Sequence, residues 1–236
     1  MYGIFFSFWN MAKSPSIFLK TPNKKLLLFF TILFLSKSLS AFEVTPQYQV
    51  VFINGASSSG KSTLIKEFQK KSPTPFLHTG VDYMIDMMPC KLINWEDGES
   101  PQGLSWKVIY DQDGSIMRKP HSGPYTNKVF NSMTSIIKAL VNDGLYVVVD
   151  YVAFGKEDLD KIKEELSSLK ILWVGIHCPL NIIEKREKDR GDRTIGFARY
   201  FYHNTHKGNN YDLNLDTHTN TLEENTSLIL QNLYNK

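Results

Sequence analysis

Short apolar runs alternate with amphipathic segments from about residue 45 to the end of the chain. Residues 49–54 form a β-branched and aromatic run that ends in a glycine turn, which is typical of a buried parallel strand. Residues 61–71 then place Leu64, Ile65 and Phe68 on one helical face. The same two patterns predict further strands at 76–79, 146–152 and 171–177, and helices at 125–142, 157–169, 179–190 and 222–233. A polar strand is expected near 211–215.

This alternation of strands and helices predicts an α/β fold, with a parallel sheet covered by helices on both faces. The chain has no internal repeat, so the alternation describes one domain. Residues 91–124 are rich in glycine, proline and tryptophan and fit neither pattern, so we expect them to be irregular.

Composition and charge limit the class of protein. The 236 residues carry a formal charge of +3, and 42% of them are hydrophobic, which excludes intrinsic disorder and collagen-like repeats. The charge is unevenly placed, because residues 1–41 contain five lysines and no acidic residue. The rest of the chain has 22 basic and 24 acidic residues, so its charge does not favour nucleic acid as a partner.

The N-terminal segment has the order of zones found in a secretory signal. Lys24 and Lys25 precede an apolar run at 26–35, and small residues follow up to Ala41. We therefore expect 1–41 to be a targeting segment of an exported protein and 42–236 to be the folded domain. The alternatives are an uncleaved anchor and a mis-assigned start codon, and in the second case the protein would be cytoplasmic. The run is shorter than the roughly 20 residues that span a bilayer, so no stable membrane span is expected.

A glycine-rich loop follows the first predicted strand and opens the first predicted helix. It satisfies the pattern G-x-x-x-x-G-K-[ST], which in this context binds nucleotide phosphates through backbone N–H groups. Lys61 would reach the outer phosphates, and the Ser62 hydroxyl would coordinate Mg²⁺. The alternative is a Gly/Ser turn with a solvated lysine. The predicted nucleotide-binding residues are Gly55, Ala56, Ser57, Ser58, Ser59, Gly60, Lys61 and Ser62.

Two carboxylates are predicted at the same edge of the sheet as this loop. Asp150 follows an apolar run, as in strands whose carboxylate holds Mg²⁺ through a water molecule, although it could merely cap the strand. Asp82 stands 20 residues after Ser62, at the expected end of the second strand. There it could accept the proton of an acceptor hydroxyl that attacks the γ-phosphate. Asp86, one helical turn further, could be the base instead, or both could be solvated.

Arg190 and Arg193 bracket a flexible Gly-Asp directly after a predicted helix. A lid of the adenylate-kinase type would place guanidinium charge on the transferring phosphoryl group from this position. A surface charge run is the alternative. With Lys61 and Asp82, the two arginines are the predicted catalytic residues.

Five sequence blocks occur in order from residue 48 onwards: INGASSSGKS, GVDYMIDMMP, VVVDYVAFG, ILWVGIHC and RGDRTIGFA. His206, Tyr211-Asp212 and Asp216-Thr217 follow them. In these residues, over 48–220, the chain resembles the chloramphenicol phosphotransferase-like kinases. The family often has two adjacent acids on its third strand, where this chain has Asp150-Tyr151.

The resemblance implies a P-loop kinase of parallel sheet order 2-3-1-4-5, with Asp82 as general base and with Arg190 and Arg193 in an arginine-bearing lid. It also implies ATP as phosphoryl donor, Mg²⁺, and a small-molecule acceptor with a hydroxyl group. Residues 91–124 should contribute acceptor contacts but have no counterpart, so the identity of the acceptor does not carry over.

Two function classes are therefore open. The first is a small-molecule hydroxyl kinase; shikimate- or gluconate-kinase-like chemistry would use the same layout with another acceptor pocket. The second is a nucleotide-binding NTPase or regulatory protein without a small-molecule acceptor. Asp82 and the lid arginines favour the kinase. Neither the oligomeric state nor a preference for ATP over GTP can be inferred from the sequence.

Overall fold

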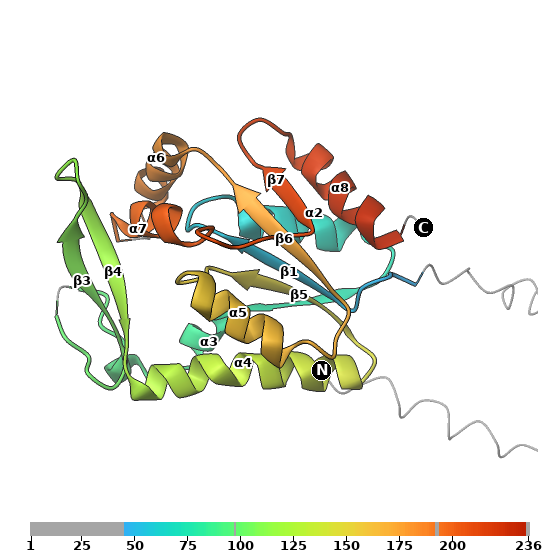
Figure 1. Ribbon diagram of the computed structural model, residues 1–236, viewed down its shortest axis with the longest axis horizontal. Helices are drawn as coiled ribbons and strands as arrows, with labels where there is room; N and C mark the ends of the chain where they lie inside the picture. The colour runs from blue at the N-terminus through green and yellow to red at the C-terminus, as the bar shows by residue number, and fades with distance from the viewer. Residues whose placement is uncertain (1–44, 97, 192–193, 235–236) are drawn as a thin grey trace, which may run out of the picture. The chain divides into compact units, whose positions relative to one another are not determined.

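The computed structural model describes residues 45–96, 98–191 and 194–234 (Figure 1). Residue contacts divide the chain into Met1–Glu43 and Val44–Lys236, and the second unit contains all of the described residues. The predicted targeting segment 1–41 and Arg193 lie outside the described residues. Within the described ranges, no helix combines the length and the apolar character that crossing a membrane requires.

A five-stranded parallel sheet forms the centre of the domain. Its strands lie in the order β2-β5-β1-β6-β7, which reads 2-3-1-4-5 when these five strands are numbered along the chain. This is the order that the family resemblance implies. The strands are β1 (Val50–Gly55), β2 (Phe76–Gly80), β5 (Tyr146–Tyr151), β6 (Ile171–His177) and β7 (Leu213–Asp216).

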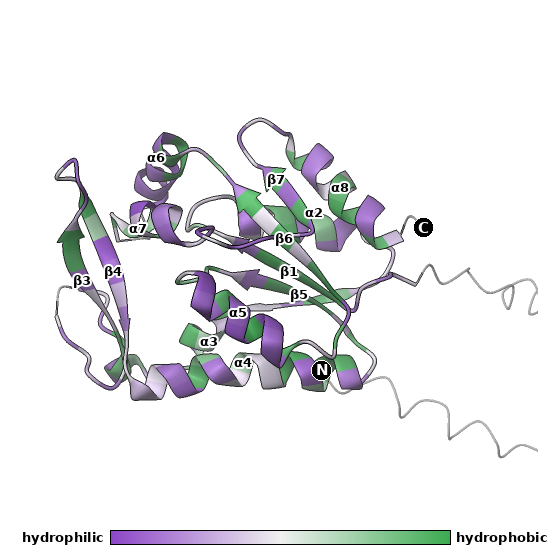
Figure 2. Cartoon of the chain, viewed as in Figure 1, coloured by the Kyte–Doolittle hydropathy of each residue, from purple (hydrophilic) through white to green (hydrophobic). Residues whose placement is uncertain are grey.

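Helices cover both faces of this sheet, as the alternating pattern predicts (Figure 1). Side chains alternate along β1, so that Val50 and Phe52 pack on one face, and Val51 and Ile53 on the other. Three buried strands, β1, β5 and β6, are largely hydrophobic in Figure 2. The first face packs against α3 (Val81–Asp86), α4 (Pro124–Asn142) and α5 (Lys156–Glu165), and the second against α2 (Lys61–Lys71) and α8 (Leu222–Tyr234).

The prediction that residues 91–124 are irregular is wrong for most of the segment. Strands β3 (Leu104–Tyr110) and β4 (Ile116–Ser122) form an antiparallel hairpin beside α6 (Leu180–Arg190) and α7 (Phe197–Asn204) (Figure 1). The turn between them holds Gly114 at φ 75°. Pro120 and the polar residues of β4 hide this hairpin in the sequence, because a proline argues against a strand. Helices α3 and α7 were not predicted either.

Asn54, the residue before the predicted phosphate loop, is fully buried and connects three parts of the chain. Its amide donates to the Thr205 carbonyl (3.1 Å) and to the Tyr211 hydroxyl (2.7 Å). Its oxygen accepts the N–H of Ala153 (2.9 Å). The end of β1 is therefore tied to the segment after β5 and to the segment between α7 and β7.

His206 completes this cluster in its neutral form. Its Nε2 lies 3.0 Å from the Ile176 carbonyl, which can only accept, so Nε2 carries the proton and Nδ1 accepts from Tyr211 (2.9 Å). Burial, followed by the nearby His177 ring, lowers the pKa of His206 to about 4. Burial also raises the pKa of Tyr211 to about 12, so its hydroxyl keeps its proton.

This assignment predicts a pH dependence of stability. Folding lowers the pKa of His206 from its ordinary value of 6.5 to about 4. Between these two pH values the unfolded chain binds more protons than the folded protein, so the free energy of unfolding decreases as the pH falls from 6.5 to about 4. We expect His206→Gln, whose amide can still donate to the Ile176 carbonyl, to weaken the pH dependence there. Urea unfolding at several pH values measures this effect, with the exposed His121→Gln as control. An unaltered pH dependence in His206→Gln would contradict the neutral assignment.

Candidate active site

The predicted phosphate loop connects β1 to α2 in a conformation that suits anion binding. Ser58 (φ 61°) and Gly60 (φ 96°) are left-handed, and such turns direct backbone N–H groups into a concave nest. At Gly55 a Cβ atom would come within 2.9 Å of the Ile176 carbonyl oxygen, so only glycine fits there. The hydroxyls of Ser58 and Ser59 are buried and have no hydrogen-bond partner within the described ranges. A cradle with such unpaired donors fits a phosphate group.

Lys61 is the first residue of α2 and is buried. Its ammonium donates to the carbonyls of Gly55 (2.9 Å) and Ala56 (3.0 Å) and lies 3.6 Å from an Asp150 carboxylate oxygen. It also lines the cavity above the loop. The Lys61 side chain therefore lies beside the phosphate loop and lines the cavity that the sequence predicts to bind nucleotide.

Ser62 and Asp150 come together although 88 residues separate them. The Ser62 hydroxyl donates to an Asp150 carboxylate oxygen at 2.9 Å. Mg²⁺ in phosphoryl-transfer sites needs only one or two protein ligands, because phosphates and water complete its shell. This pair fits such a site, and no group of three or more His, Cys, Asp or Glu side chains gathers into another metal site within the described ranges.

The residue after Asp150 has a structural role. Tyr151 points into the core, and its hydroxyl donates to Asp158 (2.9 Å to the nearer oxygen). The same Asp158 oxygen accepts the N–H of Phe154 at 3.0 Å. Burial raises the pKa of Tyr151 well above its ordinary value and also raises that of Asp158. Tyr151 and Asp158 thus form a hydrogen-bonded pair in the interior, and Tyr151 is not part of the carboxylate cluster.

A first cavity of about 560 Å³ opens above the loop. Arg190, at the end of α6, lines it, as does Arg186 one turn earlier on the same helix. The Arg186 guanidinium is held by the Thr217 carbonyl at 3.1 Å. Arg186 was not predicted, because the charged run 184–190 resembles a solvated helix face. Its spacing of four residues from Arg190 was the available signal. Further lining residues are Ser57, Ser58, Gly60, Lys61, Ser62, Asp82, Asp150, Thr217 and Asn220.

A second cavity of about 450 Å³ has a different character. Residues from α3, α4, the hairpin, α7 and the segment after β5 line it, and most of them are apolar. None of its lining residues in the described part of the chain is a lysine or arginine. Its aromatic lining residues, none of which was singled out from the sequence, are Trp95, Trp106, Phe130, Phe154, Phe197 and Phe201.

Asp82 lies where the two cavities meet. It is an exposed residue of the first turn of α3, and together with Ser57, Val81 and Val152 it lines both cavities. Asp86, one turn further along α3, lines only the second cavity. The structure therefore places Asp82, the predicted base, and Asp86, the alternative, differently relative to the two cavities.

The parallel sheet order and the glycine-rich loop between β1 and α2 define the P-loop class of α/β proteins. More particularly, the chain belongs to the chloramphenicol phosphotransferase-like family, whose model matches residues 48–234. The resemblance inferred from the sequence blocks is thereby confirmed.

Individual relatives agree with this family. A Mycobacterium tuberculosis protein, recorded in strains CDC 1551 and H37Rv and named "Putative O-phosphotransferase", is 27% identical over 186 residues, which are 79% of this chain and 82% of that protein. An unliganded sugar kinase from Janibacter sp. HTCC2649 superimposes with a TM-score of 0.51 at 16% identity, over 78% of this chain and 93% of that chain. At this identity the second likeness shows the shared fold alone.

The position of Lys61 generates a prediction about nucleotide affinity. Lys61→Met keeps the buried stem but removes the ammonium, and a hydrogen bond between charged groups contributes about 1.5–3 kcal/mol. We therefore expect Mg²⁺–nucleotide affinity to fall by about 10- to 150-fold, with the helix content unchanged. Titration calorimetry measures the affinity, and Lys70→Met on the exposed side of the same helix is the control. Equal affinity in Lys61→Met and the wild-type protein would rule out the assigned role.

Proposed function

We propose that the protein transfers the γ-phosphoryl group of ATP, with Mg²⁺, to a hydroxyl group of a small molecule. The observation that supports this proposal most is the position of Asp82, which lines both the cavity at the phosphate loop and the second cavity. A carboxylate at that boundary can face a donor on one side and an acceptor on the other.

The first cavity suits the nucleotide. Cationic groups of Lys61, Arg186 and Arg190 surround it, and the N-terminus of α2 adds positive potential next to the loop. Arg186, Thr217 and Asn220 line the first cavity but, unlike Asp82, not the second, and they would contact the nucleoside part. Ser62 and Asp150 would hold Mg²⁺, which would neutralise negative charge on the nucleotide phosphates.

The second cavity suits an uncharged or cationic acceptor with an apolar body. Its volume lies in the range of small-molecule sites, and aromatic side chains line it. Two carboxylates, Asp82 and Asp86, face it, whereas its described lining offers no cationic side chain to a carboxylate or phosphate. An anionic acceptor such as gluconate is therefore disfavoured, and a hydroxylated aromatic compound is favoured.

In the proposed reaction Asp82 accepts the proton of the acceptor hydroxyl. The hydroxyl oxygen forms a bond to the γ-phosphorus, the bond from that phosphorus to the β,γ-bridging oxygen breaks, and ADP leaves with the electron pair. Arg190, and Arg193 by its place in the sequence, would stabilise the charge on the transferring group.

The test is transfer of label from γ-labelled ATP into a mixture of hydroxylated aromatic compounds, sugars and sugar acids. We expect a labelled aromatic product that depends on both Mg²⁺ and the acceptor. ATP hydrolysis at the same rate with and without every acceptor would favour the NTPase alternative.

Substitution of the two α3 carboxylates tests the assignment of the base. Asp82→Asn keeps the shape but cannot take the proton, so we expect turnover to fall by roughly 10²-fold or more while nucleotide affinity barely changes. Asp86→Asn is the matched control, and we expect it to change the acceptor KM with transfer retained. Steady-state kinetics and calorimetry measure both. If Asp86→Asn loses turnover and Asp82→Asn keeps it, Asp86 is the general base. Full activity in both variants would refute the proposed mechanism.

A further inference from the structure

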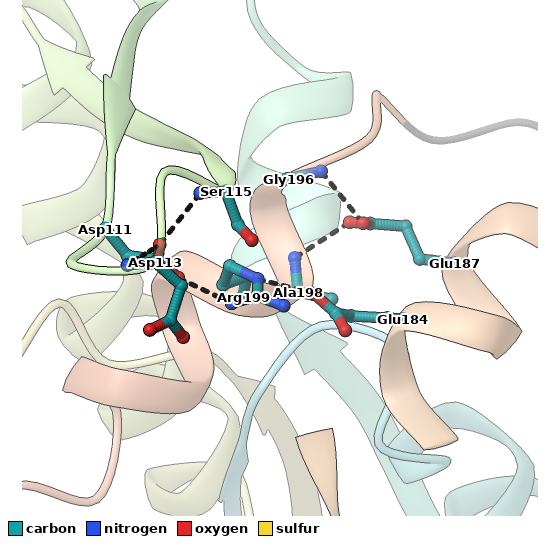
Figure 3. Close-up of polar contacts among 8 residues, drawn as sticks. All are labelled: Asp111, Asp113, Ser115, Glu184, Glu187, Gly196, Ala198 and Arg199. Carbon is teal, nitrogen blue, oxygen red and sulfur yellow. Dashed lines mark hydrogen bonds and ion pairs between the residues drawn. The ribbon is translucent and has the colours of Figure 1, made fainter. Parts of the chain in front are cut away.

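Arg199, on α7, contacts both the preceding helix α6 and the distant β3–β4 hairpin (Figure 3). Its Nη1 donates to Asp111 in the turn of the hairpin, and its Nε donates to Glu184 on α6. The side chains of Arg199 and Asp111 are 15% and 11% exposed, so this pair is largely removed from water. The Asp111 carboxylate also accepts the N–H of Asp113 and of Ser115, both at 2.9 Å, which fixes the turn.

Glu187, which is 1% exposed, joins α6 to α7 (Figure 3). One carboxylate oxygen accepts the N–H of Gly196 (2.9 Å) and the other accepts the N–H of Ala198 (2.7 Å). A carboxylate at a helix N-terminus satisfies backbone donors and interacts favourably with the helix dipole. Because Arg190 follows Glu187 by three residues on the same helix, its position depends on how α6 is held.

The hairpin packs on the start of α7 as well. The N–H of Arg118 donates to the Gly196 carbonyl (3.1 Å), and the Arg118 guanidinium donates to the Ile195 carbonyl. The rings of Trp106 on β3 and Phe197 on α7 meet edge to face with centroids 4.0 Å apart. These two rings belong to the walls of the second cavity.

These contacts connect the two cavities through one assembly. The hairpin and α7 supply Trp106 and Phe197 to the second cavity, whereas α6 supplies Arg186 and Arg190 to the first. Arg199 is not among the described residues that line either cavity. Any effect of Arg199 on the reaction must therefore pass through the elements that it holds together.

We infer that Arg199 is a positioning residue which, through Asp111 and Glu184, couples the acceptor-cavity wall to the helix that carries the nucleotide-site arginines. Binding in one cavity then favours the arrangement that the other cavity needs. The acceptor half of this inference depends on the proposed function, whereas the coupling between the nucleotide cavity and the hairpin does not.

Hydrogen exchange measures this coupling without any acceptor. In the wild-type protein we expect Mg²⁺ and the non-hydrolysable analogue AMP-PNP to slow amide exchange in β3 and β4 by about 5- to 150-fold, the usual range for coupled sites. In Arg199→Met the hairpin should lose this response, whereas amides of the phosphate loop should still be protected. Arg199→Lys should restore only part of it, because an ammonium cannot reproduce the guanidinium fork toward two carboxylates.

Two further variants make the result decisive. Asp111→Asn weakens one arm of the contact with little change of shape, so it replaces Arg199→Met if that variant fails to fold. Asp160→Asn removes an ion pair with Lys156 on α5 and is the control that should behave like the wild-type protein. The inference is wrong if bound nucleotide leaves amide exchange in β3 and β4 of the wild-type protein unchanged. It is also wrong if nucleotide slows this exchange equally in the wild-type protein and in the Arg199 or Asp111 variant.

Kinetics with an identified acceptor give the second readout. We expect Arg199→Met to lower kcat and to raise the acceptor KM. Because coupling between two sites is reciprocal, the KM for ATP at saturating acceptor should rise as well. A lower melting temperature with unchanged kinetic constants would mean a merely structural role and would also overturn the inference. If no compound accepts phosphate, the proposed function fails, yet the exchange experiment still decides on the coupling. Absence of nucleotide binding to the wild-type protein would refute both.

Discussion

The close approach of β2 and β5 at their carboxyl ends is the constraint on which the site depends. Gly80 pairs with Asp150, and a Cβ atom on Gly80 would lie 2.1 Å from the Asp150 carbonyl oxygen. Glycine is needed at position 80 because a side chain would have no space there. Its backbone conformation does not require glycine, since φ 165° is extended and accessible to any residue. This contact brings the turn that carries Asp82 beside the strand end that carries Asp150. The neighbouring pairing of β5 with β1 places both next to the phosphate loop.

The two cavities differ in chemistry because different elements build them. The parallel sheet and the N-terminus of α2 supply the polar, cationic cavity, as the carboxyl edge of such sheets commonly does. The hairpin, α4 and α7 lie outside the central sheet and supply the aromatic cavity. In the proposed reaction, donor binding would thus depend on the parallel sheet, whereas acceptor selectivity would depend on segments outside it.

The sequence predicts the parts of this arrangement that have local signals. The phosphate loop, its flanking strand and helix, and β2, β5 and β6 follow from apolar periodicity and a spaced motif, whereas β7 was expected as a polar strand near 211–215. Helix α2 was predicted at its observed bounds, 61–71. The sequence predicts Ser62, Asp82 and Asp150 at one edge of the sheet. In the structure the Ser62 hydroxyl contacts Asp150, and Asp82 lines the cavity at the phosphate loop. The catalytic and metal-binding roles of these residues remain predictions.

Features made by distant side chains could not be predicted in this way. The contact between Arg199 and Asp111 spans 88 residues, and neither residue shows a periodic or motif-based signal. The position of Asp82 after a strand favours it over Asp86, but that Asp82 lines both cavities and Asp86 only the second follows from the structure alone. The hairpin was missed because Pro120 interrupts β4, although Asp113-Gly114 is a turn signal that could have suggested it.

Direct transfer between the two cavities is the central claim, and the stereochemical course at phosphorus tests it most directly. ATP made chiral at the γ-phosphorus with oxygen isotopes would be used with the acceptor found in the labelling experiment. A single in-line displacement at the boundary marked by Asp82 predicts inversion of configuration in the product. Retention would require a phosphorylated enzyme intermediate and would contradict this account.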